Sequence, residues 1–305
     1  MRVLLATDGS DTAGAAVRFV AGFPFPSGTD VKIVSVIPSV LRDHEIETLT
    51  PEQRTAFEES KSGTRIEVEE LLDSEAAVLR QAGWSVTTEI GVGHPAAEIV
   101  GAAEDYDANL IVVGSHGLTG FKRFLLGSVS NQVFQSSKRS VLIVRQPEAE
   151  CEGSQPELPA LHGHPWRILV GYDGSEPSEK AIAFCTSLDF GDEAAIRVLT
   201  VLPMVRLFRQ DIRQELNWIW QQKKETEKQS LEAAADRIRE VTAGVTTALT
   251  EAGDVSHAIL AAGEDFKADL IVLGHKGKGA IEKFLMGSVT PRIAQHSCRS
   301  VLAIR

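Results

Sequence analysis

The sequence predicts an α/β protein made of two tandem domains, each a doubly wound parallel sheet of five strands. Three observations support this fold: the chain repeats itself, strand-like and helix-like segments alternate, and glycine-rich turns follow predicted strands. The 305 residues are 43% hydrophobic and 24% charged, a composition typical of globular proteins and a length sufficient for two domains. We therefore expect each half of the chain to bury a core of its own.

Four short blocks occur twice in the same order and at nearly constant offset, which indicates a duplicated domain. "RVLLATDGS" recurs as "RILVGYDGS", "DANLIVVGSHG" as "KADLIVLGHKG", "FLLGSVS" as "FLMGSVT", and "SSKRSVLIVR" as "HSCRSVLAIR". The stretch between the copies is rich in proline, glycine and acidic residues, as linkers are. We predict domain 1 over residues 1–146, a linker over 147–165 and domain 2 over 166–305.

The elements of each copy follow from residue type and periodicity. Short runs of aliphatic residues predict strands, and longer segments with apolar residues at helical spacing predict helices. Their alternation requires crossover connections and therefore a parallel sheet covered on both faces. The second copy follows the same order, with a long helix over about 209–241. In the first copy, strands are predicted at 3–7, 31–37, 85–90, 110–113 and 141–144, and helices at 12–21, 51–82, 95–104 and 128–136.

The predicted topology indicates where a ligand would bind. In open parallel sheets, ligands lie beyond the carboxyl ends of the strands, at the point where the strand order reverses. Both glycine-rich segments and both "DGS" turns directly follow predicted strands. Each copy is therefore expected to carry a candidate site at this edge.

The glycines share the spacing Gly-x2-Gly-x9-Gly-Ser in both copies, which is neither the GxxxxGK[ST] phosphate loop nor GxGxxG. The final Gly-Ser pair opens a predicted helix, where free N–H groups, the helix dipole and a hydroxyl favour an anion. We expect the glycines to allow positive φ and the close approach of a ligand. A helix cap with a tight turn is the structural alternative, and it stays open because duplication also copies structural glycines.

Taken together, "ATDGS" after the first strand, "LIVVGSHG", the glycine spacing and the closing "SVLIV" resemble the universal stress protein family. The resemblance covers nearly all of both halves. It implies a tandem Rossmann-like fold of the adenine nucleotide alpha hydrolase type, in the branch that binds ATP at these glycines. The implied function is a cytoplasmic stress-response sensor or regulator that binds ATP or another adenine nucleotide, with or without Mg²⁺.

The resemblance also implies which residues bind the nucleotide. An acidic residue contacts the ribose, the backbone at a strand end meets the adenine, and the glycine segment holds phosphate and ribose. For each acidic residue, a cap on the following helix is the alternative. The second copy has "GHKGKG" where the first has "GSHGLTG", so the two sites need not bind alike. The implied residues are Asp8, Val36, Gly114, Gly117, Gly127, Ser128, Val129 and Ser130, then Asp173, Val201, Gly274, Gly277, Gly287, Ser288, Val289 and Thr290.

The sequence offers no nucleophile–base–orienter set, so we name no catalytic residue and expect at most slow Mg-dependent ATP hydrolysis. His116 is favoured as a hydrogen-bonding contact rather than a base, because Lys276 takes its place in the second copy. Cys151, His162 and His164 match no usual metal-ligand spacing, so no metal site is expected.

Charge and hydropathy limit the partners. The net charge of -11 gives no global support to a nucleic-acid partner. No apolar stretch reaches the length of a membrane span, and the N-terminus lacks the layout of a signal peptide, so we expect a cytoplasmic protein without a membrane partner. A homodimer, a regulatory protein partner and a nucleotide-independent partner-binding module remain open.

Overall fold

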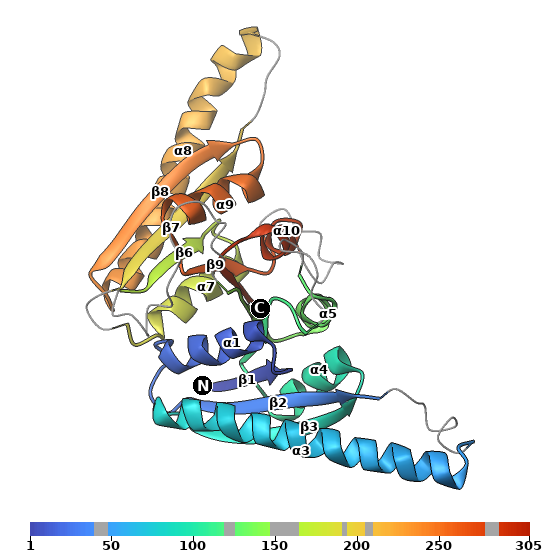
Figure 1. The fold of residues 1–305 in the computed structure, drawn as a ribbon. Coiled ribbons are helices and arrows are strands. Elements are labelled where there is room, and N and C mark those ends of the chain that lie inside the picture. The colour runs from blue at the N-terminus through green and yellow to red at the C-terminus, as the bar shows by residue number, and fades with distance from the viewer. Residues whose placement is uncertain (40–47, 119–125, 147–164, 191–193, 205–209, 278–286) are drawn as a thin grey trace. The chain divides into compact units, whose positions relative to one another are not determined.

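The computed structural model of the chain describes residues 1–305 except 40–47, 119–125, 147–164, 191–193, 205–209 and 278–286 (Figure 1). Most of the predicted linker therefore lies outside the described residues. Contacts divide the chain into two compact units, the first drawn from the N-terminal half and the second mainly from the C-terminal half. Among the described residues, no helix combines the length and the hydropathy needed to cross a bilayer.

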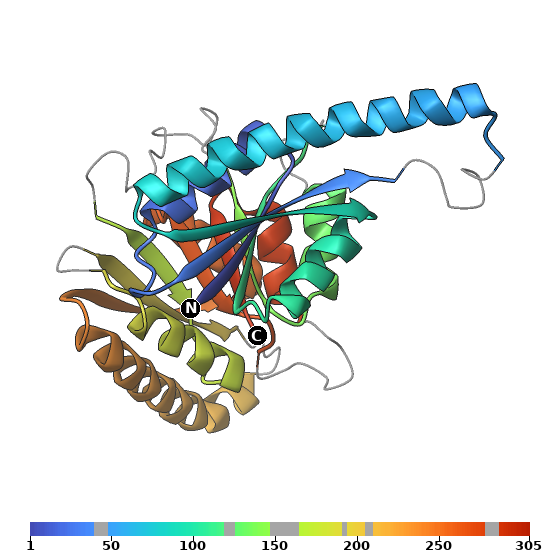
Figure 2. The same cartoon turned by 90° about the horizontal axis from the view of Figure 1, so that it is seen from below.

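In the first unit, five parallel strands lie in the order β3-β2-β1-β4-β5. The order reverses between β1 and β4, because the chain first builds outward through β2 and β3 and then returns to the other side of β1. Helices α1 and α3 contact each other on one face, and α4 and α5 contact each other on the other face (Figure 2). The elements are β1 (Arg2–Thr7), α1 (Asp11–Gly22), β2 (Asp30–Pro38), α3 (Pro51–Gln81), β3 (Ser85–Gly93), α4 (Pro95–Asp105), β4 (Leu110–Gly114), α5 (Ser128–Ser136) and β5 (Ser140–Val144).

The second unit repeats this topology, with parallel strands in the order β8-β7-β6-β9-β10. Helices α7 and α8 pack together on one face, and α9 packs with α10 on the other. The elements are β6 (Arg167–Gly171), α7 (Glu176–Thr186), β7 (Ala195–Pro203), α8 (Gln210–Arg239), β8 (Gly244–Ala252), α9 (Val255–Asp265), β9 (Leu270–Gly274), α10 (Val289–His296) and β10 (Ser300–Ile304).

The predicted fold class is confirmed, and the central strands show its physical basis. Leu4 and Leu5 of β1, Ile111 of β4 and Ile168 of β6 are fully buried, as expected for strands covered on both faces. The largest difference from the predicted bounds is β3, which was expected to end at residue 90. It continues to Gly93 because its pairing with β2 runs on to the register Pro38↔Gly93.

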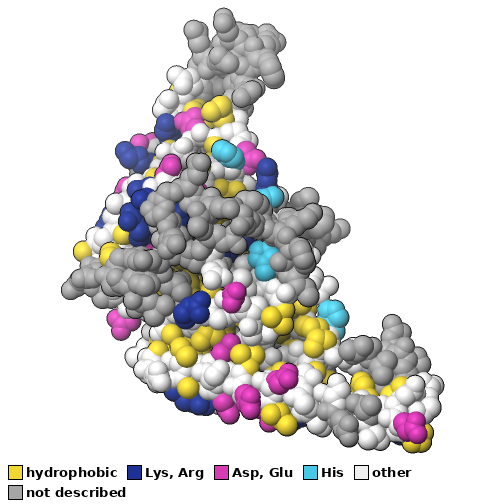
Figure 3. Space-filling view, viewed as in Figure 1, with side chains coloured by type: hydrophobic (Ala, Val, Ile, Leu, Met, Phe, Trp, Pro, Cys, Tyr) yellow, Lys and Arg dark blue, Asp and Glu magenta, His cyan; other side chains and the backbone are white. Residues whose placement is uncertain are grey.

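Helix α3 begins at a capping box, in which Thr50 and Gln53 satisfy each other's backbone N–H groups, with Pro51 in the first turn. Figure 1 shows its N-terminal turns extending past the ends of β2 and β3. The visible surface over this helix carries both acidic and hydrophobic side chains (Figure 3). Among the side chains of α3 that the structure describes, the buried ones, such as Leu72 and Leu79, lie in its C-terminal half.

Candidate functional site

The turn after β1 orients Asp8 at the point where the strand order reverses. Gly9 has φ +74°, which glycine adopts without strain. The Ser10 N–H donates to Asp8 Oδ1 at 3.0 Å, and the Leu118 N–H donates to Asp8 Oδ2 at 3.2 Å. The side chain of Ser10, not that of Asp8, caps helix α1 by accepting from the Ala13 N–H. The helix-cap alternative for Asp8 is therefore wrong.

The turn after β6 has the same construction in the second unit. Gly174 has φ +70°, and the Ser175 N–H donates to Asp173 Oδ1 at 3.0 Å. Helix α7 is capped by the Ser175 side chain, which accepts from the Ser178 N–H. The helix-cap alternative is thus wrong for Asp173 as well, and both carboxylates stand beside the glycine segments.

The motif glycines leave room for the protein's own chain. A Cβ at Gly117 would lie 2.5 Å from Asp8 Oδ2, and a Cβ at Gly277 would lie 2.6 Å from Asp173 Oδ2. A Cβ at Gly114 would lie 2.9 Å from the Thr12 carbonyl carbon. The motif glycines adopt no positive φ, since the described glycines that do are Gly9, Gly28, Gly83, Gly93 and Gly174. The expectation of positive φ is therefore wrong for the motif. The lack of a Cβ instead allows Asp8, Thr12 and Asp173 to lie close to these glycines.

The Gly-Ser pairs lie at helix starts, as predicted. Gly127 is the N-cap of α5, so Ser128 is its first residue, while Ser288 is the N-cap of α10. Neither N-cap residue makes a side-chain capping bond, so the first N–H groups of both helices are not satisfied in that way. The Ser130 hydroxyl donates to the Gly114 carbonyl at 2.7 Å, and Thr290 makes the same bond to Gly274. These hydroxyls therefore hold each helix start beside the end of the preceding strand.

Val36 and Val201, the valines predicted at strand ends, lie next to the turns that carry Asp8 and Asp173. Thr7 pairs with Ser35 across β1 and β2, so Asp8 and Val36 follow on neighbouring strands. In the second unit, the Tyr172 N–H donates to the Leu199 carbonyl at 2.9 Å, and the Thr200 hydroxyl donates to the Tyr172 carbonyl at 2.8 Å. The register brings Val201 to the same edge as Asp173.

A cavity of about 710 Å³ occupies this edge of the second unit. Its size falls within the range of small-molecule sites, about 300–1,000 Å³. The lining includes aliphatic side chains such as Leu202 and Ile259, and it also includes Asp173, Lys276 and the start of α10. The lining includes every residue predicted for the second site: Asp173, Val201, Gly274, Gly277, Gly287, Ser288, Val289 and Thr290.

The cavity also has lining residues that the sequence did not reveal. Lys223 and Glu227 on α8 and Tyr172 at the end of β6 all face it. Lys223 and Glu227 are four residues apart and so share one helix face. The only sequence signal for them is that α8 follows the strand carrying Val201, which does not say which helix face meets the site.

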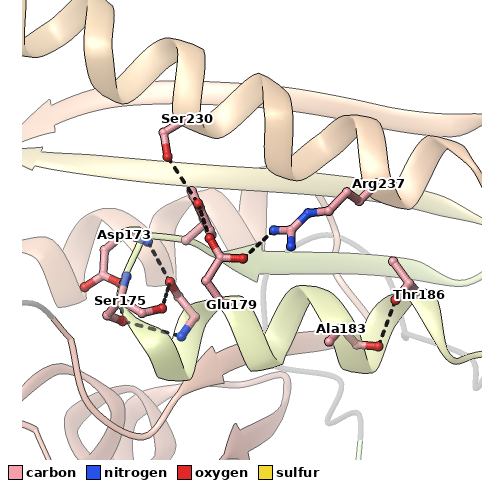
Figure 4. A network of polar contacts seen from close by, with 9 residues as sticks. Asp173, Ser175, Glu179, Ala183, Thr186, Ser230 and Arg237 are labelled. Carbon is pink, nitrogen blue, oxygen red and sulfur yellow. Dashed lines mark hydrogen bonds and ion pairs between the residues drawn. The ribbon is translucent and has the colours of Figure 1, made fainter.

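Tyr172 links the acidic turn to two helices. Its hydroxyl contacts Glu179 Oε1 at 2.5 Å and Ser230 Oγ at 3.1 Å, and Arg237 pairs with Glu179 at 2.5 Å. Figure 4 shows Ser230 and Arg237 of α8 pointing toward Glu179 of α7. Burial and the hydrogen bond to Glu179 raise the pKa of Tyr172. This polar network fixes α8, and with it one wall of the cavity, against α7.

His116 and Lys276 hold matching positions beside the helix starts. A Cβ at Gly127 would lie 3.2 Å from the His116 Cα, and a Cβ at Gly287 would lie 3.4 Å from the Lys276 Cα. His116 Nδ1 lies 3.0 Å from Ser115 Oγ, which is a contact to a neutral hydroxyl rather than to an orienting carboxylate. This geometry agrees with a hydrogen-bonding role for His116.

Within the described ranges, no group of three or more His, Cys, Asp or Glu side chains could hold a metal ion. Cys151, His162 and His164, which were considered as ligands, lie outside the described residues.

Comparison with known proteins agrees with this fold. The profile described as "Universal stress protein family" matches residues 1–145 and again residues 166–305. The chain therefore belongs to the universal stress protein family and carries its domain twice. A universal stress protein of Mycolicibacterium smegmatis is 27% identical over 306 residues, covering 99% of this chain and 96% of that relative.

Two further comparisons address a single domain and the fold. A universal stress protein of Methanocaldococcus jannaschii is 32% identical over 153 residues, which span 48% of this chain and 94% of that protein. The crystal structure of a universal stress protein from Archaeoglobus fulgidus has a TM-score of 0.62 and 21% identity, covering 100% of this chain and 96% of that one. At this identity, the structural likeness supports the tandem fold alone.

Proposed function

We propose that this protein is a cytoplasmic stress-response regulator that binds an adenine nucleotide, ATP above all, in each of its two domains. The domains extend over residues 1–146 and 166–305, and the ligand contacts are those predicted from the sequence. In each site the acidic residue accepts hydrogen bonds from the ribose, the strand-end valine meets the base, and the helix start receives the phosphates. Binding is the function of these sites, with hydrolysis slow at most and Mg²⁺ as a companion of the phosphates.

The observation that carries this proposal is the composition of the cavity in the second unit. A nucleotide has a flat, weakly polar base at one end and anionic phosphates at the other. The cavity offers the aliphatic side chains of Leu199, Leu202 and Ile259 together with the cationic Lys276 and the N-terminus of α10. Asp173 provides an acceptor for ribose hydroxyls in the same lining.

The test is calorimetric titration of nucleotide-stripped protein with ATP and Mg²⁺. A Gly127→Val/Gly287→Val double variant adds side chains that press against the backbone of His116 and Lys276, and so displaces each glycine segment from the helix start that would receive the phosphates. Gly253→Val is the matched control, because a Cβ at Gly253 meets nothing within 4 Å. Circular dichroism and thermal melting first establish that each variant is folded.

We expect saturable binding by the wild type and by the control, and none by the folded double variant. The stoichiometry, together with the two single variants, assigns binding to one domain or both. A wild type that neither binds ATP nor releases nucleotide when stripped would overturn the proposal and leave the partner-binding module as the leading function. The regulatory role is tested by the survival, under stress, of cells that carry the folded double variant.

A further inference from the structure

A buried carboxyl group lies beneath the first candidate site. Glu75 on α3 is 8% exposed, and its Oε1 accepts a hydrogen bond from the Thr7 hydroxyl at 2.8 Å. Its Oε2 is buried and has no hydrogen-bond partner among the described residues. Burial raises the pKa of Glu75, and the nearby Asp8 adds to the rise, while the bond from Thr7 opposes it. A buried carboxyl disfavours folding unless something compensates, so its place beside Asp8 calls for a role.

The Thr7 hydroxyl connects Glu75 to the turn that carries Asp8. It donates to Glu75, and it lies 3.3 Å from the Gly9 N–H, from which it accepts. Thr7 is itself buried at 6% exposure, so bulk water does not replace these partners. Glu75 thereby fixes the rotamer of Thr7, and Thr7 in turn fixes the left-handed Gly9.

The direction of the Asp8 side chain depends on this turn. Its two oxygens are held by the N–H groups of Ser10 and Leu118, one on the turn and one on the glycine segment. Its Oδ2 also lies close to Gly117, where a Cβ would be only 2.5 Å away. A small rotation of the turn would therefore move the carboxylate relative to the glycine segment.

The second domain supports its turn differently. Tyr172 precedes Asp173 where Thr7 precedes Asp8, and the buried pattern Leu72-x-x-Glu75 corresponds to Leu231-x-x-Ala234. In the second domain, the larger Tyr172 therefore takes the position of Thr7, and the smaller Ala234 takes the position of Glu75. A Glu75 substitution is accordingly expected to change the first site and to leave the second site unchanged, which provides an internal control.

We propose that Glu75 is a positioning residue of the first site, acting through the Thr7 hydroxyl to orient Asp8 toward the ribose hydroxyls and so setting the preference of that site for ribonucleotides over deoxyribonucleotides. This inference rests on the proposed nucleotide binding. A hydrogen bond to a charged acceptor contributes enough to change affinity by roughly tenfold or more. A misplaced Asp8 loses that contribution for ATP, whereas 2′-deoxy-ATP has less to lose.

The experiment compares ATP with 2′-deoxy-ATP in a Gly287→Val background, so that only the first site is titrated. In this background we expect ATP to be preferred by roughly tenfold. Glu75→Ala should weaken ATP binding and bring the preference to within roughly twofold. Glu75→Gln retains an acceptor for Thr7 and should keep the preference.

Three further variants separate positioning from a general loss of structure. Thr7→Val removes the connecting hydroxyl and should reproduce Glu75→Ala. The Thr7→Val/Glu75→Ala double variant should be no worse than either single one, because both interrupt the same connection. Glu70→Ala removes an exposed carboxylate from the same helix and should change nothing.

The outcomes distinguish the two proposals. If the background protein binds no nucleotide while the wild type does, nucleotide binding by the first site fails. If it binds ATP with the preference and folded Glu75→Ala retains it, the positioning role of Glu75 is overturned. If Glu75→Ala does not fold, Thr7→Val decides by the same criterion, and a loss of the preference in folded Glu75→Gln would also overturn the role. Parallel titration of the second site in a Gly127→Val background should show no effect of Glu75.

Discussion

Removing the hydroxyl of Tyr172 tests how the second site is held together. Tyr172→Phe deletes one contact to the Glu179 carboxylate at 2.5 Å and one to Ser230 at 3.1 Å, and leaves a ring that is 5% exposed in place. Hydrogen bonds to charged groups contribute about 1.5–3 kcal/mol. The Glu179 side chain is 39% exposed, so water replaces part of the lost bond. We expect the free energy of unfolding to fall by about 1–2 kcal/mol and Tm by about 2–8 °C.

The chain contains two tyrosines, which makes Tyr106→Phe a matched control. The Tyr106 ring lies under the Lys32 ammonium at 4.8 Å, a contact that Phe retains, and its hydroxyl bonds to no described residue. Urea denaturation monitored by circular dichroism should show little change for this variant. Equal losses in the two variants, or a loss below about 0.5 kcal/mol for Tyr172→Phe, would refute the network.

The pH dependence of stability provides a second test of Tyr172, with a predicted direction. Because burial and Glu179 raise the pKa of Tyr172 in the folded state, its stabilising contribution is present below the unfolded pKa near 10 and is lost as pH rises through the folded value. The stability difference between the wild type and Tyr172→Phe should therefore shrink at alkaline pH. A difference that grew with pH would contradict this assignment.

Three other predictions follow from burial and backbone geometry. Glu75→Gln should raise the free energy of unfolding at about pH 8 and have little effect at about pH 4. The folded-state pKa of Glu75 is raised, so its carboxyl is neutral in the folded protein at low pH, and its ionisation as pH rises costs stability that Gln does not lose. Denaturant titrations at both pH values check this. Gly101→Ala within α4 should stabilise the protein by about 0.5–1 kcal/mol in thermal melts, since a Cβ there meets nothing within 4 Å. Burial raises the pKa of the Cys185 thiol to about 12, so peptide mapping should find thiol reagents at the half-buried Cys298 and at Cys185 only after unfolding.

Much of the fold could be predicted because it depends on local pattern and chain order. The strand predicted at 110–113 and the helix predicted at 128–136 were located to within one residue, because the sequence changes clearly in residue type on either side of each. The end of β3 was missed because Gly91 and Gly93, on either side of Val92, are of a residue type depleted in strands, and pairing with β2 holds these residues in the sheet. The predicted positive φ of the motif glycines failed because spacing alone does not reveal what a Cβ would strike.

The sequence by itself determined the duplication, the parallel sheet and the edge at which the glycine segments lie, because periodicity and connectivity leave few alternatives. Only the tertiary structure placed Glu75 beneath Thr7 and brought Lys223 and Glu227 to the cavity wall. Thr7 and Glu75 are 68 positions apart, and their contact depends on how α3 packs on the sheet. Side-chain packing between distant elements leaves no periodic trace in the sequence, so the supports of the two sites could be read only from the folded chain.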